Sequence, residues 1–154
     1  MGLARGGMAD CVVRDALARV DFALMSGKWE EAIQVAVRSG SITPSKHIVE
    51  KAIAEGNWQA IAHLAVRAQR YPTPIAEYVY RQLERATPQD VNDSARRGMW
   101  DAVSGIGTCG NEKAALRAVE VARQNRRGAV LHAVSGLAKS KAASERARGI
   151  LGGD

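Results

Sequence analysis

One phrase occurs twice in this chain, 29 residues apart. Residues 27–38 read GKWEEAIQVAVR and residues 56–67 read GNWQAIAHLAVR, with Gly, Trp and the closing Ala-Val-Arg in register. In each copy the apolar residues lie at the tryptophan and then three, four, seven and eight positions later, which is the spacing of one face of an amphipathic α-helix. The repetition therefore predicts two equivalent helices, each separated from the preceding helix by a glycine.

A second recurring feature, the dipeptide Thr-Pro, accompanies these helices. It occurs at Thr43-Pro44, Thr73-Pro74 and Thr87-Pro88. A threonine at the N-cap accepts a free backbone N–H, and a proline at the next position lacks the N–H that would have no partner. Each Thr-Pro therefore predicts a helix start, and the order of Thr-Pro helix, glycine and Trp helix returns after 29 or 30 residues.

A third copy is degenerate. Residues 87–107 keep Thr-Pro, Gly98 and Trp100, but the helix that follows Trp100 carries a serine and two glycines. We expect residues 105–110, GIGTCG, to form a flexible loop between copies, because glycine disfavours a helix. Further apolar stripes that predict helices are Val13, Ala16, Leu17, Val20 and Leu24; Ile48, Val49, Ala52 and Ile53; Ile75, Tyr78, Val79 and Leu83; and Val130, Ala133, Val134 and Leu137.

Helix pairs with this period indicate an α-solenoid, in which neighbouring pairs stack because no pair can bury its own apolar face. The alternative is an irregular helical bundle, in which two similar helices occur by chance. Both folds are all-α, and the apolar fraction of 46%, dominated by Ala and Val, suits closely packed helices. We expect a flexible N-terminus over residues 1–9 and one helical-repeat domain over residues 10–152, with Trp29, Trp58 and Trp100 packed in its core.

The stretch HLAVRAQRYPTPIAEYV, residues 63–79, resembles a unit of the HEAT-like and leucine-rich-repeat-variant families. Those units carry an Ala-Val-Arg helix, a short link with proline and a Thr-Pro start. The resemblance covers residues 27–86. It implies a stacked helical scaffold whose faces bind other macromolecules, and it brings no catalytic residues.

The side chains that usually carry chemistry form no recognisable motif. No histidine lies beside a second histidine or a cysteine at ligand spacing, and the chain has no G-x-S-x-G, P-loop or H-E-x-x-H sequence. His63 is expected to face away from the apolar stripe, in solvent or at a junction between helices. Cys11 and Cys109 are expected to be small buried thiols. We therefore predict no catalytic residue, no cofactor and no metal site.

The charge is concentrated toward the C-terminus. The chain has 22 basic and 16 acidic residues, a net charge of +6. Residues 113–148 hold nine Lys or Arg against two Glu, a local excess of +7 that could attract a polyanion or an acidic protein. The candidate contacts for such a partner are Arg123, Arg126, Arg127, Lys139, Lys141, Arg146 and Arg148. Because Arg123, Arg126 and Arg127 end one helix, we expect them to lie at the opposite end of the next hairpin from the other four.

These observations favour a non-enzymatic protein-interaction module or adaptor. One alternative is a helical protein that binds nucleic acid, weakly, through residues 113–148. A second is a small enzyme or effector with an unrecognised site. No apolar run approaches the roughly 20 residues that cross a bilayer, and the N-terminus lacks the apolar core of a signal peptide, so we expect a cytoplasmic protein without a membrane partner. Met8 is an alternative to Met1 as the start.

Overall fold

The structure is a computed structural model that describes residues 2–69 and 74–153, with side chains from residue 11 onward. In these ranges it contains ten α-helices and no β-strand, which confirms the all-α class. The helices are α1 (Gly2–Met25), α2 (Trp29–Ser39), α3 (Ile42–Glu55), α4 (Trp58–Ala68), α5 (Pro74–Glu84), α6 (Pro88–Arg96), α7 (Trp100–Cys109), α8 (Glu112–Gln124), α9 (Gly128–Leu137) and α10 (Lys141–Leu151).

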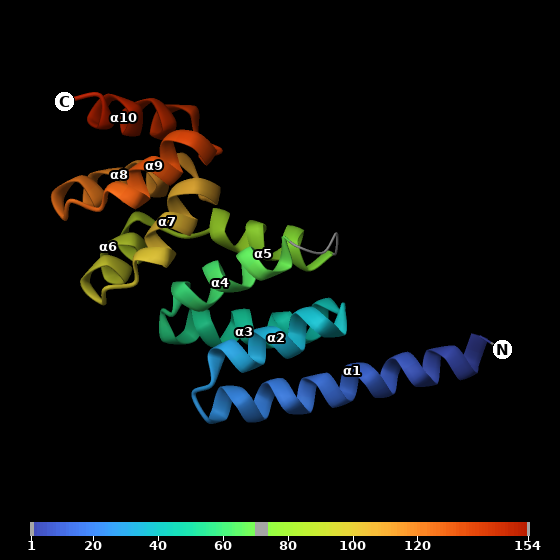
Figure 1. Cartoon of the computed structure of the whole chain (residues 1–154). Helices are drawn as coiled ribbons and strands as arrows, with labels where there is room; N and C mark the ends of the chain where they lie inside the picture. The colour runs from blue at the N-terminus through green and yellow to red at the C-terminus, as the bar shows by residue number, and fades with distance from the viewer. Residues whose placement is uncertain (1, 70–73, 154) are drawn as a thin grey trace.

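The helices stack in two rows from α1 to α10 (Figure 1). In one row α2, α4, α7 and α9 contact one another in that order. In the other row α1 contacts α3 and α3 contacts α5, while α6 contacts α8 and α8 contacts α10. The stacked helix pairs of the predicted fold are therefore confirmed. Each helix pair has a first helix, in the row of α1 and α3, and a second helix, in the row of α2 and α4. The pair that contains α7 is irregular, because two helices, α5 and α6, take the place of its first helix.

The turns that lead into α2, α4, α7 and α9 share one geometry. Gly27, Gly56 and Gly98 have φ of 73°, 67° and 73°, in the left-handed region that glycine enters without a steric cost. In each turn the following residue donates its N–H to a carbonyl five residues earlier, at 2.7–2.8 Å, which closes a Schellman motif. The accepting carbonyls belong to Ala23, Ala52, Ser94 and Ala122.

The repeated phrase does not mark the fourth turn, which leads into α9. Arg126 stands in place of the glycine, with φ of 56°, and Gly128 stands in place of the tryptophan that begins the other helices. Arg127 still donates its N–H to Ala122 at 2.8 Å. The backbone hydrogen bonds therefore reproduce the turn without either of the two residues that marked it in the sequence.

The three Thr-Pro helix starts have different outcomes. Thr87 caps α6, because its hydroxyl accepts the N–H of Asp90 at 3.1 Å and the Asp90 carboxylate accepts the N–H of Thr87 at 2.8 Å. The N-cap predicted at Thr43 is wrong: Ser41 caps α3 and accepts the N–H of Thr43, so the helix begins two residues before its proline. Thr73 lies outside the described residues.

The tryptophans differ in burial. Trp58 is buried in the core with Ile61, Ala62 and Ala65. Trp29 and Trp100 are only partly buried, although both pack against the core. The guanidinium of Arg127 lies over the Trp100 ring, 4.6 Å from its centroid, so a cation covers this indole where full burial was expected.

Three residues assigned to apolar stripes are exposed instead. Ile53, Val66 and Leu137 have exposed fractions of 46%, 58% and 74%. Each lies in the last turn or two of its helix, at the edge of its stripe. Val66 and Leu137 both open into the groove described below.

The glycine-rich stretch expected to be a loop is helical. Helix α7 continues through Cys109. Its glycines are compatible with a helix here because they allow neighbouring helices to pack closely against α7. A Cβ at Gly105 would lie 3.0 Å from the Ala62 Cβ of α4, and one at Gly107 would lie 2.7 Å from the Val134 Cγ2 of α9. The small residues therefore serve close packing and not flexibility.

Helix α1 also extends further than predicted. It begins at Gly2, so residues 2–9, expected to form a flexible N-terminus, are its first turns. The domain boundary at residue 10 stays a prediction. No helix in the described ranges has the length and apolar character needed to cross a bilayer.

Candidate functional site

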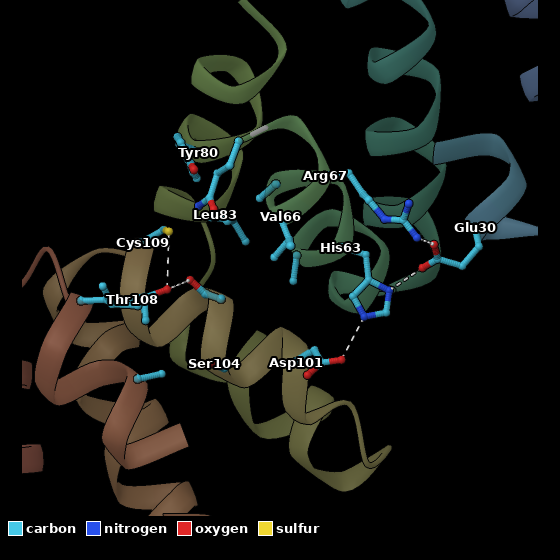
Figure 2. A pocket seen from close by; sticks show the side chains of 16 residues that line it. Glu30, His63, Val66, Arg67, Tyr80, Leu83, Asp101, Ser104, Thr108 and Cys109 are labelled. Carbon is cyan, nitrogen blue, oxygen red and sulfur yellow. Dashed lines mark hydrogen bonds and ion pairs between the residues drawn. The ribbon is translucent and has the colours of Figure 1, made fainter. Parts of the chain in front are cut away.

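An open groove follows one face of the row of second helices (Figure 2). Its volume is about 550 Å³, and it is lined by residues from α2, α4, α5, α7 and α9. It is therefore built from four helix pairs and belongs to none of them alone. A smaller hollow continues it past Tyr80 and Leu137 to Glu84 and Lys139.

His63 lies between two carboxylates at one end of this groove. Its Nδ1 is 2.9 Å from Oε1 of Glu30 on α2, and its Nε2 is 2.9 Å from Oδ2 of Asp101 on α7. Arg67, one turn further along α4, donates to Oε2 of Glu30 at 3.2 Å. The exposed fractions of the side chains are 34% for His63, 55% for Glu30 and 67% for Asp101. Three consecutive helix pairs thus meet at one partly hydrated cluster.

The protonation state of His63 determines how many hydrogen bonds the ring makes with the two carboxylates. A neutral imidazole has one N–H donor and one acceptor nitrogen, whereas the imidazolium has two donors. Since both nitrogens face carboxylate oxygens, both contacts are hydrogen bonds only in the imidazolium form. In the neutral form one carboxylate loses its hydrogen bond to the ring.

Gln59 fixes the Asp101 side of the cluster. Its Oε1 accepts the N–H of Ala102 at 2.9 Å, in the first turn of α7, where helix N–H groups have no partner inside the helix. Its Nε2 donates to Oδ2 of Asp101 at 3.3 Å. One amide side chain of α4 therefore both caps α7 and orients the carboxylate that faces His63.

The remainder of the groove is largely apolar. Val66 and Leu137 are exposed on its surface, and Tyr80 is half-buried beside them. Cys109 is also half-buried here, 3.5 Å from the Thr108 hydroxyl, at the opposite end of the view from His63 (Figure 2). The prediction of two buried thiols is wrong, because Cys11 is exposed.

The smaller hollow beyond Tyr80 and Leu137 carries another ion pair. Lys139 Nζ pairs with Glu84, and the Lys139 N–H donates to the carbonyl of Thr108 at 2.8 Å. This lysine, predicted as a contact for a polyanion, is therefore already paired with a carboxylate.

The other predicted basic contacts differ in the groups that they contact. Arg123 on α8 and Arg146 on α10 both pair with Glu120, at 3.5 and 3.1 Å, so the prediction that these two lie at opposite ends of the hairpin is wrong. Arg127 covers Trp100. Arg126, Lys141 and Arg148 are exposed. The helices α8 and α10 thus bring two arginines together onto one glutamate, which offsets much of their charge.

Two more titratable side chains interact away from the groove. His47 Nδ1 is 2.9 Å from Oδ1 of Asp21, which joins α3 to α1. Burial and the nearby Glu50 carboxylate raise the pKa of Tyr78, and Arg85 lowers it. Among the described residues, no group of three His, Cys, Asp or Glu is placed to hold a metal ion.

Comparison of the chain with protein-family models, with curated proteins and with solved structures finds no match. The resemblance of residues 27–86 to HEAT-like and leucine-rich-repeat-variant units therefore stays a prediction. The inference of function depends on the geometry of the groove.

Proposed function

We propose that this chain is a non-enzymatic interaction module that holds a segment of a partner protein in the groove. The observation that carries the proposal is the exposure of Val66 and Leu137 on a concave surface, beside the half-buried Tyr80 and next to the His63 cluster. Apolar surface with a few fixed polar groups is the usual lining of a binding cleft. Stacked helices present such surfaces to peptide segments.

The titratable groups of the groove suit binding better than catalysis. His63, Glu30 and Arg67 are engaged with one another, and Cys109 has a hydroxyl as its neighbour and not a base. A nucleophile needs an adjacent base or a lowered pKa to react. The arrangement therefore supports a role in recognition.

Nucleic-acid binding through residues 113–148 is the alternative, and the ion pairs weaken it. Glu120 lies between Arg123 and Arg146, and Glu84 accepts Lys139. Each such pair reduces the positive potential that a phosphate backbone would meet. We therefore expect only weak, sequence-independent association with DNA or RNA.

The test is selection of peptides from a random 12-residue display library on the immobilised chain, followed by binding measurements with the peptides recovered. Val66→Glu and Leu137→Glu should each weaken binding at least tenfold, because each places a carboxylate on the apolar surface. Phe22→Glu is the matched control, since Phe22 is an apolar residue with a comparable exposed fraction, 71%, but lies on α1, outside the groove. Equal binding by the groove variants and the control would contradict the proposal.

A parallel measurement addresses the alternative. Wild type and the triple variant Arg123→Glu, Arg126→Glu and Arg127→Glu are titrated with duplex DNA and with RNA over a range of salt concentrations. A tight affinity that falls steeply with salt, and that the triple variant loses, would rank nucleic-acid binding above the interaction module.

A further inference from the structure

We propose that Glu30 and Asp101 receive a lysine or arginine side chain of the partner segment, whose apolar side chains lie on Val66, Tyr80 and Leu137. This inference rests on the function proposed above and specifies the chemistry of the partner. It makes the His63 cluster a recognition subsite for a cation at the end of the apolar surface.

With a neutral His63, the charge of the groove lining is opposite in sign to that of the whole protein. The charged residues that line the groove are Glu30, Asp101, Arg67 and His63, so that with neutral His63 two carboxylates face one guanidinium. The chain as a whole has a net charge of +6. A local negative charge in a positive protein attracts a cation at this place and disfavours an acidic or phosphorylated segment.

The two carboxylates are accessible to a partner. Asp101 is 67% exposed and Glu30 is 55% exposed, and Figure 2 shows both at the edge of the groove with His63 between them. A guanidinium or ammonium group can therefore reach them without displacing a helix. A carboxylate that stays partly hydrated in the complex loses less of its solvation free energy than one that the partner buries completely.

The cation subsite and the apolar surface lie close together. His63 and Val66 are three residues apart on α4, which places them on neighbouring turns about 5–6 Å apart. An extended peptide advances about 3.3 Å per residue. The cationic residue of the partner should therefore lie within about three residues of an apolar one.

His63 and the partner cation compete for the same carboxylates. The imidazolium hydrogen-bonds both of them, whereas neutral His63 leaves one without that bond. The charged groups facing His63 are Glu30 from α2, Arg67 from α4 and Asp101 from α7, and the polar group nearest them is Gln59. The imidazole and the partner cation therefore contact the same two carboxylates.

A double-mutant cycle tests the subsite. A peptide recovered from the library, free of His, Asp and Glu, is compared with its Lys or Arg→Gln counterpart on wild type and on Asp101→Asn. We expect the peptide substitution to weaken binding about fivefold on wild type and less than twofold on the variant, as for a partly hydrated ion pair. Glu31→Gln is the matched control, because Glu31 is an exposed carboxylate on α2 that does not line this groove.

The outcomes separate the two proposals. Peptides that depend on Leu137 but carry no cation, or that show the same loss on wild type and Asp101→Asn, would overturn the cation subsite and leave the interaction module standing. Peptides that bind independently of Leu137 would overturn both.

Discussion

Gly107→Ala tests whether the glycines of α7 serve close packing. A Cβ at this position would lie 2.7 Å from the Val134 Cγ2 of α9 and 3.2 Å from the Ala118 Cβ of α8, and both partners are fully buried. Overpacking of a core costs about 1–3 kcal/mol. Alanine in place of glycine inside a helix recovers about 1 kcal/mol. The difference between the two terms predicts that the free energy of unfolding falls by up to about 2 kcal/mol.

Gly136→Ala in α9 is the matched control. No atom of the residues that the structure describes lies within 4 Å of the Cβ it would add, so only the gain in helix propensity remains, and we expect up to about 1 kcal/mol of added stability. Both variants are measured by urea unfolding followed by far-UV circular dichroism. For a chain of this length 1 kcal/mol corresponds to about 2–4 °C in Tm.

The sign of the difference decides the interpretation. A loss of stability in Gly107→Ala together with a gain in Gly136→Ala would show that α7 needs a residue without a side chain where α8 and α9 pack against it. An equal gain in both variants would refute the packing argument, and the prediction of a flexible stretch at residues 105–110 would return.

Three further changes have expected effects on unfolding, each measured in the same way. Arg126→Gly should stabilise by about 0.5–1 kcal/mol, because relief of the left-handed conformation outweighs the entropy that glycine adds to the unfolded chain; a loss would refute this. Ser94→Ala should stabilise by about 1 kcal/mol, because the Ser94 hydroxyl is buried without a hydrogen-bond partner among the described residues; a destabilised variant would point to a partner for it. Trp58→Ala should cost about 3–5 kcal/mol as a core truncation, and a change below 1 kcal/mol would contradict its role in the core.

The sequence predicts the helices and turns best where one local interaction decides the structure. Gly27, Gly56 and Gly98 supply the positive φ that the turns require, and Thr87 with Asp90 forms a cap from residues three apart. At Thr43 a second candidate cap, Ser41, lies two residues earlier and takes the role. Serine is generally the stronger N-cap, so the ranking of cap residues would have favoured it.

Burial is harder to predict, because an apolar stripe shows which residues share a face but not which neighbour covers that face. Val66 and Leu137 lie on the same stripes as buried residues, yet both are open to the groove. Their exposure depends on how α4, α7 and α9 stack. It also gives the groove the apolar surface on which the proposed function depends.

The charged cluster follows from a register that the stacking creates. The residue after each tryptophan is Glu30, Gln59 or Asp101, and all three lie in the first turns of helices that stack side by side. His63 lies one turn beyond Gln59 and so faces the acidic residue of the pair on either side. The polar residue after each tryptophan is visible in the sequence. Trp58 and Trp100 are 42 residues apart, because two helices, α5 and α6, precede α7 where one helix precedes α4. This longer spacing makes it difficult to see from the sequence that Asp101 has the same register as Glu30.

A single helix pair contains at most one of the two carboxylates. The subsite therefore exists only where α2, α4 and α7 are stacked in order, and a partner cation held there bridges the first and third pairs across the second. The contacts among α2, α4 and α7 therefore determine both the packing of the three pairs and the binding of a partner cation at this end of the groove. A substitution that loosens the stack, such as one at Gly105 where α7 lies against Ala62, should weaken the cation subsite without touching a charged residue.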